Sequence, residues 1–373
     1  MISLAASIVR APRAVDPDRG TAALARLGGA FATGPARDLA HGAAGSSPFL
    51  ARLIDRHGVW LTEAADLPLD AALDALIAEA ASAGKDRRSL TPALRVMRGR
   101  ASLLIALADL GGVWDLVQVT GALSRLARAA LDLALPPLLA AERARGTLPQ
   151  GEGMGGYTII GMGKLGAEEL NYSSDIDLIC LYDQDQLSPD DEPQARQGFI
   201  RVTRALVQML SAQTAEGYVF RTDLRLRPNP STTPVCLAMA AAERYYEAEG
   251  RTWERAAHIK AAPVAGDLDA GAAYLDRLAP FLWRRSLDFY AIEEVQGLLE
   301  KIRIGAGEHH MPTPESLPGT DIKRCPGGIR EIEFYAQTRQ LILGGRNPAL
   351  RAPGTVAALG ALAEAGTVKR DLA

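Results

Sequence analysis

Two aspartates stand where the sequence otherwise predicts a buried strand. Residues 156–183 read GYTIIGMGKLGAEELNYSSDIDLICLYD, and Asp175 and Asp177 come directly before the apolar run LICLY. Burying a carboxylate costs free energy unless a cation or hydrogen bonds compensate for it, and two neighbouring carboxylates cost more. This pattern indicates a strand whose first residues carry a functional site.

Side chains two residues apart on a strand point to the same face, about 6 to 7 Å apart along it. Asp175 and Asp177 are therefore expected to converge, with Ser173 and Ser174 leading into them. Carboxylates together with phosphate oxygens and water suit Mg²⁺, and two metal ions about 3.5 to 4 Å apart can promote an in-line phosphoryl displacement. We predict a metal site here; a turn or cap at the start of the strand is the alternative.

The loop before the aspartates, GMGKLG, places Gly161, Gly163 and Gly166 in the G-x-G-x-x-G pattern of dinucleotide-binding proteins. A Rossmann fold would have its acidic residue about 20 residues later, at the end of a second strand. A P-loop is excluded because Lys164 lies within the glycines. We interpret the loop as a phosphate-binding turn contacted through Lys164 and the N–H groups of Gly163 to Gly166, with a surface lysine on a tight turn as the alternative.

A further polar strand is predicted in FRTDLRLRP, residues 220–228. Alternation would put Arg221, Asp223, Arg225 and Arg227 on one face. Asp223 would complete the metal site, and Arg225 and Arg227 would bind phosphate. A cross-strand salt bridge for Asp223, and solvated or structural pairing for the two arginines, are the alternatives.

Two later motifs add candidates. In WERAAHIK, Trp253 and Lys260 fall on one helical face, which makes Lys260 a candidate phosphate ligand and Trp253 a candidate core residue. In GGIREIEF and the residues after it, Arg330, Glu333 and Gln337 share one face; salt bridging on a solvated helix and closure of a site explain this equally well.

The periodicity divides the 373 residues into three parts. Residues 1–150 show apolar positions at helical spacing, residues 151–265 alternate strands and helices, and residues 266–373 are helical again. The region 218–228 is expected to be a strand, residues 194–214 a helix, and residues 308–328 a long loop. The predicted class is α+β.

The 41 basic and 44 acidic residues give a net charge of −3, which offers no electrostatic reason to expect tight, non-specific binding of nucleic acid. A polyanion could be bound only by a local group of basic residues. No run reaches the roughly 18 to 20 apolar residues of a membrane span. Three scattered cysteines give neither a disulfide framework nor a zinc motif. We expect a cytoplasmic protein that binds neither nucleic acid nor membrane.

Taken together, the motifs carry a resemblance. The order of the glycine loop, SSDIDL and a distal aspartate strand resembles the DNA polymerase β-type nucleotidyltransferase core, a mixed sheet with helices, here flanked by helical segments. The full string GMGKLGAEELNYSSDIDLICLYD, with FRTDLRLRPNPSTTP and DIKRCPGGIREIEFYAQTRQLILGGRNPALR, is similar to the glutamine synthetase adenylyltransferase/adenylyl-removing family. The resemblance covers about residues 156–351.

Members of this family resemble two such domains in tandem, one attaching AMP to a tyrosine of glutamine synthetase and one removing it. NYSSDIDL and GGIREIEF look like the N-terminal, deadenylylating copy. The resemblance implies Mg²⁺-dependent phosphorolysis: inorganic phosphate attacks adenylylated glutamine synthetase and ADP forms.

The implied site residues are Asp175, Asp177 and Asp223 for the metal and catalysis. The residues predicted to contact nucleotide or phosphate are Gly161, Gly163, Lys164, Gly166, Ser174, Arg225, Arg227 and Lys260. A PII-type signal protein is the implied regulator. The alternatives are adenylyl transfer from ATP onto glutamine synthetase or another acceptor, and a non-enzymatic docking module for glutamine synthetase or the PII-type protein.

Overall fold

A computed structural model describes residues 3–84, 86–151, 153–285, 297 and 319–368 of the chain. These residues form two compact units, and the chain passes between them several times. The first unit takes in residues 1–154, 168–176 and 189–223, and the second takes in residues 155–167, 177–188 and 224–373. These two units differ from the three consecutive segments predicted from the sequence, and the boundaries of those segments stay a prediction.

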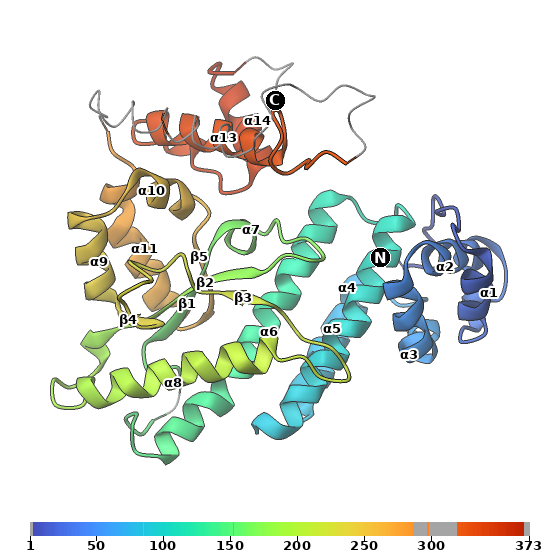
Figure 1. Cartoon of the computed structure of the whole chain (residues 1–373), viewed down its shortest axis with the longest axis horizontal. Helices are drawn as coiled ribbons and strands as arrows, with labels where there is room; N and C mark the ends of the chain where they lie inside the picture. Colours follow the sequence, from blue (N-terminus) through green and yellow to red (C-terminus); the bar gives the residue numbers. More distant parts are fainter. Residues whose placement is uncertain (1–2, 85, 152, 286–296, 298–318, 369–373) are drawn as a thin grey trace. The chain divides into compact units, whose positions relative to one another are not determined.

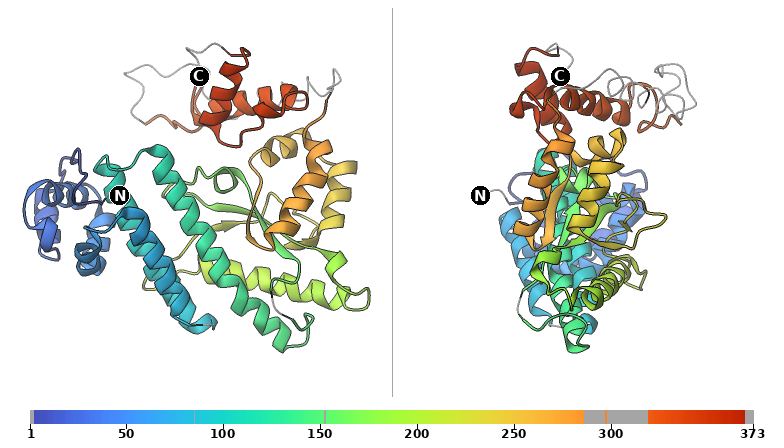
Figure 2. Two further views of the ribbon diagram at one scale, coloured as in Figure 1. Left: turned by 180° about the vertical axis from the view of Figure 1, so that it is seen from behind. Right: turned by 90° about the vertical axis from the view of Figure 1, so that its left-hand side faces the viewer.

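The first unit is built mainly of helices. Its elements are α1 (Pro17–Leu24), η1 (Gly29–Phe31), α2 (Gly34–Ser46), α3 (Pro48–Ala64), α4 (Leu69–Ser82), α5 (Arg87–Leu110), α6 (Leu116–Ala144), α8 (Glu192–Ser211) and the short strand β3 (Thr222–Asp223). The helix α5 is central: residues 101–108 are buried on every side, because α3, α4 and α6 pack around it. Figure 2 shows α5 and α6 as two long neighbouring helices.

Local sequence explains where the long helices begin. The carboxylate of Asp86 accepts hydrogen bonds from the N–H groups of Arg88 and Ser89 at the start of α5. At the start of α6, Asp115 and Gln118 form a capping box, in which each side chain accepts from the other residue's N–H group. Such caps satisfy N–H groups that have no partner within the helix.

The second unit contains a mixed sheet with helices. Its elements are β1 (Tyr157–Gly161), α7 (Gly163–Gly166), β2 (Ile176–Tyr182, of which Ile176 counts with the first unit), η2 (Gln184–Gln186), β4 (Cys236–Ala238), α9 (Met239–Ala248), α10 (Thr252–His258), β5 (Ala262–Gly266), α11 (Leu268–Leu282), α13 (Ile329–Leu343), η3 (Pro348–Leu350) and α14 (Thr355–Glu364).

The central strand β1 runs antiparallel to both β2 and β5, and β4 runs parallel to β2. In this register Ile160 lies opposite Ile179. The pairing of β1 with β5 shifts at Ile160, where it meets Pro263 on the outer strand, a position that tolerates the missing N–H group of proline. On the far side of β2, the N–H group of Ile176 donates to the carbonyl of Arg221, next to β3.

One face of this sheet is covered by α9 and α11 (Figure 1). Ile179 and Leu181, two residues apart on β2, point to this face. They pack with Tyr246 of α9 and with Tyr274 and Phe281 of α11, and all five side chains are at most 7% exposed. The mixed α+β class predicted from the sequence is therefore confirmed.

Most predicted elements are confirmed: the N-terminal helices, β1, β2, α8 and α13. The predicted strand over residues 218–228 is wrong, because only Thr222–Asp223 form a strand and the following residues turn. Residues 286–296 and 298–307 of the region predicted to be helical again, and residues 308–318 of the predicted loop, lie outside the described residues. Within the part of the chain that is described, no helix combines the length and hydropathy needed to cross a membrane.

Burial of His258 at the end of α10 predicts acid sensitivity. Its Nδ1 donates to the carbonyl of Glu254 at 2.8 Å, its ring meets Tyr246 edge-on, and burial lowers its pKa from 6.5 to about 4. As the pH falls, His258 therefore takes up a proton in the unfolded chain before it does so in the folded chain. The stability contributed by the neutral, buried His258 is fully present above the pKa of His258 in the unfolded chain, and it is lost as the pH falls toward the pKa of His258 in the folded chain.

We expect His258 alone to remove about 2 kcal/mol of unfolding free energy between about pH 7 and about pH 5. Urea unfolding at both pH values would show a smaller pH dependence for His258→Gln than for the original chain. Equal pH dependence in the two chains would contradict the assignment.

Candidate functional site

The glycine loop joins β1 to α7 and lies against Asp177. Gly163 has a φ of +53°, in the left-handed region that favours glycine. A Cβ atom at Gly163 would lie only 3.5 Å from Oδ2 of Asp177, and the N–H group of Met162 donates to the carbonyl of Asp177 at 2.9 Å. The structure thus brings the predicted loop and one predicted carboxylate together.

The other two glycines of the motif have steric roles. A Cβ atom at Gly166 would lie 1.8 Å from the carbonyl oxygen of Lys260, and one at Gly161 would lie 2.6 Å from a methyl group of Val264. The N–H group of Gly166 already donates to the carbonyl of Met162 at 3.4 Å. These glycines let the short helix and β5 approach each other.

The two aspartates lie in different surroundings, although both were predicted to stand at the start of one strand. Strand β2 begins at Ile176, so Asp177 is its second residue and is half-buried, whereas Asp175 precedes the strand and is exposed. The carboxylate of Asp175 accepts a hydrogen bond from Nε of Arg221, whose Nη2 donates to the carbonyl of Ser173 at 2.6 Å. The hydrogen bond to Asp175 raises the pKa of Arg221. Asp175 belongs to the first unit and Asp177 to the second.

The predicted polar strand face is not formed. Asp223 is half-buried at the end of β3, and Arg225 is exposed in the turn that follows. Arg227 donates to four backbone carbonyls, those of Leu224, Pro230, Thr233 and Pro234. Burial lowers the pKa of this guanidinium. The structure therefore favours the structural alternative for Arg227, which holds the 224–234 loop.

Two other predicted residues also have local contacts. The hydroxyl of Ser174 donates to the side-chain carbonyl of Asn171 at 2.7 Å, which is typical of a turn. Lys164 is half-buried within α7. Neither position excludes contact with a phosphate, and both assignments stay predictions.

Carboxylate oxygens are the donors that Mg²⁺ prefers, so Asp175, Asp177 and Asp223 fit the predicted metal in chemistry. Within the described residues, however, no three or more His, Cys, Asp or Glu side chains are grouped as a metal site. The magnesium site stays a prediction.

A pocket of about 320 Å³ lies in the second unit beside Gly163. Its wall comes from α7, α10, α13 and two loops of the second unit: Gly163, Leu226, Trp253, Ala257, Lys260, Arg330, Glu333, Phe334 and Gln337. The predicted face of α13 is confirmed, and it lines this pocket. Trp253 lines it too and is 37% exposed, so the expectation of a core tryptophan is wrong. Sequence analysis missed Leu226 and Phe334, which show no signal beyond ordinary apolar residues.

Lys260 is the buried cation of this pocket. Its side chain is 4% exposed, forms an ion pair with Glu333 of α13, and donates to Oγ1 of Thr355 of α14 at 3.0 Å. The ammonium group therefore links the end of α10 to both later helices. A buried cation beside a glycine loop can neutralise a phosphate, provided that it is not held entirely by Glu333.

Replacing Glu333 with Gln should lower the free energy of unfolding by about 2 kcal/mol, because the ammonium of Lys260 stays buried without its counter-charge. Lys260→Met should cost less, since Glu333 is 26% exposed and can be hydrated. Urea unfolding measures both, with Glu364→Gln on the exposed side of α14 as the control. A larger loss for Lys260→Met than for Glu333→Gln would contradict this reasoning.

Comparison with known proteins gives two matches to protein families. The model of the glutamate-ammonia ligase adenylyltransferase family matches residues 38–277, and the model of GlnD PII-uridylyltransferase matches residues 297–373.

Several curated relatives are bifunctional glutamine synthetase adenylyltransferase/adenylyl-removing enzymes. The one from Bradyrhizobium diazoefficiens is 46% identical over 342 residues, and the one from Xanthobacter autotrophicus is 47% identical over 346 residues. These alignments cover 89% and 91% of this chain but only 34% and 35% of the relatives. The chain therefore spans about a third of the length of these relatives.

Proposed function

The chain belongs to the glutamate-ammonia ligase adenylyltransferase family, and from this premise we propose that it removes AMP from adenylylated glutamine synthetase by phosphorolysis. The observation that carries the proposal is the position of Asp177. Its carboxylate lies beside Gly163, which lines a pocket that also contains Lys260 and Arg330. A carboxylate for a metal and cations for phosphate thus occur together in one unit.

The proposed direction of the reaction rests on the sequence motifs. NYSSDIDL and GGIREIEF resemble the deadenylylating copy of the family, and the named relatives carry both activities. We propose that this chain corresponds to the deadenylylating copy of such a protein, that it acts in the cytoplasm, and that it responds to a PII-type protein. The match of residues 297–373 to a PII-uridylyltransferase family supports the last point.

In the proposed reaction, an oxygen of inorganic phosphate forms a bond to the adenylyl phosphorus while the bond from phosphorus to the tyrosine oxygen breaks. The products are ADP and the tyrosine side chain, which takes up a proton. Both reactants are anions, so positioning and charge neutralisation supply most of the rate enhancement.

The residues of this chain have distinct roles in this scheme. Asp175, Asp177 and Asp223 would hold Mg²⁺, which when bound neutralises phosphate charge and stabilises the departing oxygen. Lys260 and Arg330 would orient the incoming phosphate from the pocket wall. The loop at Gly163 lets a phosphate approach the backbone without meeting a side chain.

The test is to incubate the chain with adenylylated glutamine synthetase, Mg²⁺ and inorganic phosphate, and to follow ADP by chromatography. Phosphate-dependent ADP is the expected result, and a phosphate-free sample is the control. AMP transfer from ATP onto unmodified synthetase, without ADP formation, would reassign the chain to the attaching activity. Binding to synthetase with neither reaction would favour a docking module.

A further inference from the structure

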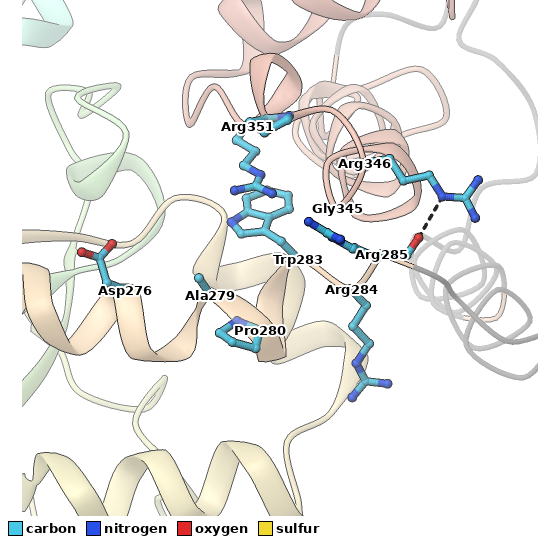
Figure 3. A pocket seen from close by; sticks show the side chains of 10 residues that line it. Asp276, Ala279, Pro280, Trp283, Arg284, Arg285, Gly345, Arg346 and Arg351 are labelled. Atoms are coloured by element: carbon cyan, nitrogen blue, oxygen red, sulfur yellow. Dashed lines mark hydrogen bonds between the residues drawn. The ribbon is translucent and has the colours of Figure 1, made fainter.

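A second pocket in the second unit is larger and shares no lining residue with the first. It has a volume of about 780 Å³ and is formed by the end of α11, the residues after it, and the turn that follows α13 (Figure 3). Its lining residues are Asp276, Ala279, Pro280, Trp283, Arg284, Arg285, Gly345, Arg346, Pro348 and Arg351. The proposed deadenylylation chemistry uses none of them.

The wall of this pocket depends on close backbone packing. A Cβ atom at Gly345 would lie 2.0 Å from the carbonyl oxygen of Arg284, and one at Gly344 would lie 2.8 Å from the ring of Trp283. The end of α13 can approach the segment after α11 only because both residues are glycines. The two arginine-bearing segments are therefore held together by the fold.

Two of the arginines are anchored in a way that leaves their terminal groups available. Nε of Arg351 donates to the carbonyl of Gly344 at 2.8 Å, and its guanidinium lies 5.1 Å from the ring centre of Trp283. Nε of Arg346 donates to the carbonyl of Arg285 at 2.8 Å, the bond drawn in Figure 3. Each side chain is thus positioned through Nε, while its two terminal nitrogens can bind an anion.

Among the residues that the structure describes, no carboxylate forms an ion pair with the arginines of this pocket. Across the described residues, none of Arg284, Arg285, Arg346 and Arg351 forms an ion pair, whereas Arg277, earlier on α11, pairs with Glu243. Asp276 is the one acidic residue among the described residues of the lining. Four guanidiniums gathered in a chain of net charge −3 do not reflect a generally basic surface.

Figure 3 shows the four arginine side chains spread around the pocket instead of meeting at one point. A ligand with a single anionic group would reach only part of this set. Guanidinium groups bind phosphate oxygens in a bidentate manner, and a concave volume of this size lies in the range of small-molecule sites, about 300 to 1,000 Å³. A flat protein interface would not need such a hollow.

We propose that this arginine pocket, lined by Arg284, Arg285, Arg346 and Arg351, binds a small molecule that carries two or more phosphate groups. The site is separate from the pocket at Gly163, so its occupant would act as an effector of the second unit and not as the phosphate that reacts.

The proposal is tested by titrating the whole chain with inorganic tripolyphosphate in a calorimeter, without Mg²⁺. The double substitution Arg284→Gln and Arg285→Gln should weaken binding about a hundredfold, because each lost charged hydrogen-bond donor is worth about one factor of ten. These side chains make no hydrogen bond or ion pair within the described residues, so the fold should be kept; circular dichroism checks this. The matched control is Arg339→Gln, since Arg339 of α13 stacks on Tyr335 outside the pocket.

Lys260→Met separates the two pockets, because it alters the pocket at Gly163 alone. We expect tripolyphosphate binding to persist in this variant and to weaken with added salt. Absence of binding at millimolar tripolyphosphate, equal binding by the double variant, or loss of binding only in Lys260→Met would overturn the proposal. Tighter binding of citrate than of tripolyphosphate would overturn the assignment to phosphorylated ligands.

Discussion

The variant Asp177→Asn should release ADP from adenylylated glutamine synthetase at least about 10³-fold more slowly than the original chain, a loss of about 4 kcal/mol of transition-state stabilisation. Asparagine keeps the shape of aspartate but removes the negative charge that would hold a cation against the phosphates. Asp177 is the predicted carboxylate that lies beside the glycine loop, so its loss cannot be compensated from the same strand.

The matched control for this variant is Asp185→Asn. Asp185 lies just after β2, is exposed, and contacts only neighbouring residues of its turn through the hydrogen bonds described. Both variants should unfold at nearly the same urea concentration as the original chain. Full phosphorolysis by a folded Asp177→Asn chain would remove the metal-site argument, whereas an equal loss in Asp185→Asn would point to a general effect of charge.

Replacing Gly166 with Ala should destabilise the second unit by at least about 4 kcal/mol, or prevent it from folding. The new methyl group would lie 1.8 Å from the carbonyl oxygen of Lys260 and 2.4 Å from that of Gly161. Both are backbone atoms, one next to β5 and one at the end of β1, so neither can move aside as a flexible side chain would. Relief of the clash requires separation of α7 from the sheet.

The control for this substitution is Gly121→Ala in α6. A Cβ atom there would meet nothing within 4 Å, and alanine in a helix interior is favoured over glycine by up to about 1 kcal/mol. We expect Gly121→Ala to raise the free energy of unfolding slightly. Urea unfolding followed by circular dichroism compares both variants; a Gly166→Ala chain as stable as the original would show that the loop and β5 are not in tight contact.

Much of the fold could be predicted from local pattern. Helical spacing located the helices of residues 1–150, and the change to short apolar runs located β1 and β2. These signals are strong because a helix face or a buried strand requires a periodic arrangement of apolar residues. The prediction of a strand over residues 218–228 is wrong for a physical reason. The sequence alternates there, but the chain turns after Asp223, and the side chain of Arg227 holds this turn by donating hydrogen bonds to backbone carbonyls.

Local sequence pattern predicted only part of the candidate site. The shared face of Arg330, Glu333 and Gln337 was visible in the sequence, but its two explanations could not be separated there. The structure shows this face lining a pocket with Lys260, more than 60 residues earlier in the chain. Such long-range pairing depends on how helices pack, and no local signal encodes it.

The sequence by itself determined the α+β class, the family, the glycine loop and the two aspartates that follow it, because each depends on residue types at short spacing. Tertiary structure alone decided that Gly163 meets Asp177, that Gly166 is required by a backbone contact, and that Lys260 is buried against Glu333. It also gathered four arginines from two distant segments into one pocket. The reason is that contact and burial are properties of packed surfaces, which form only when segments far apart in the chain come together.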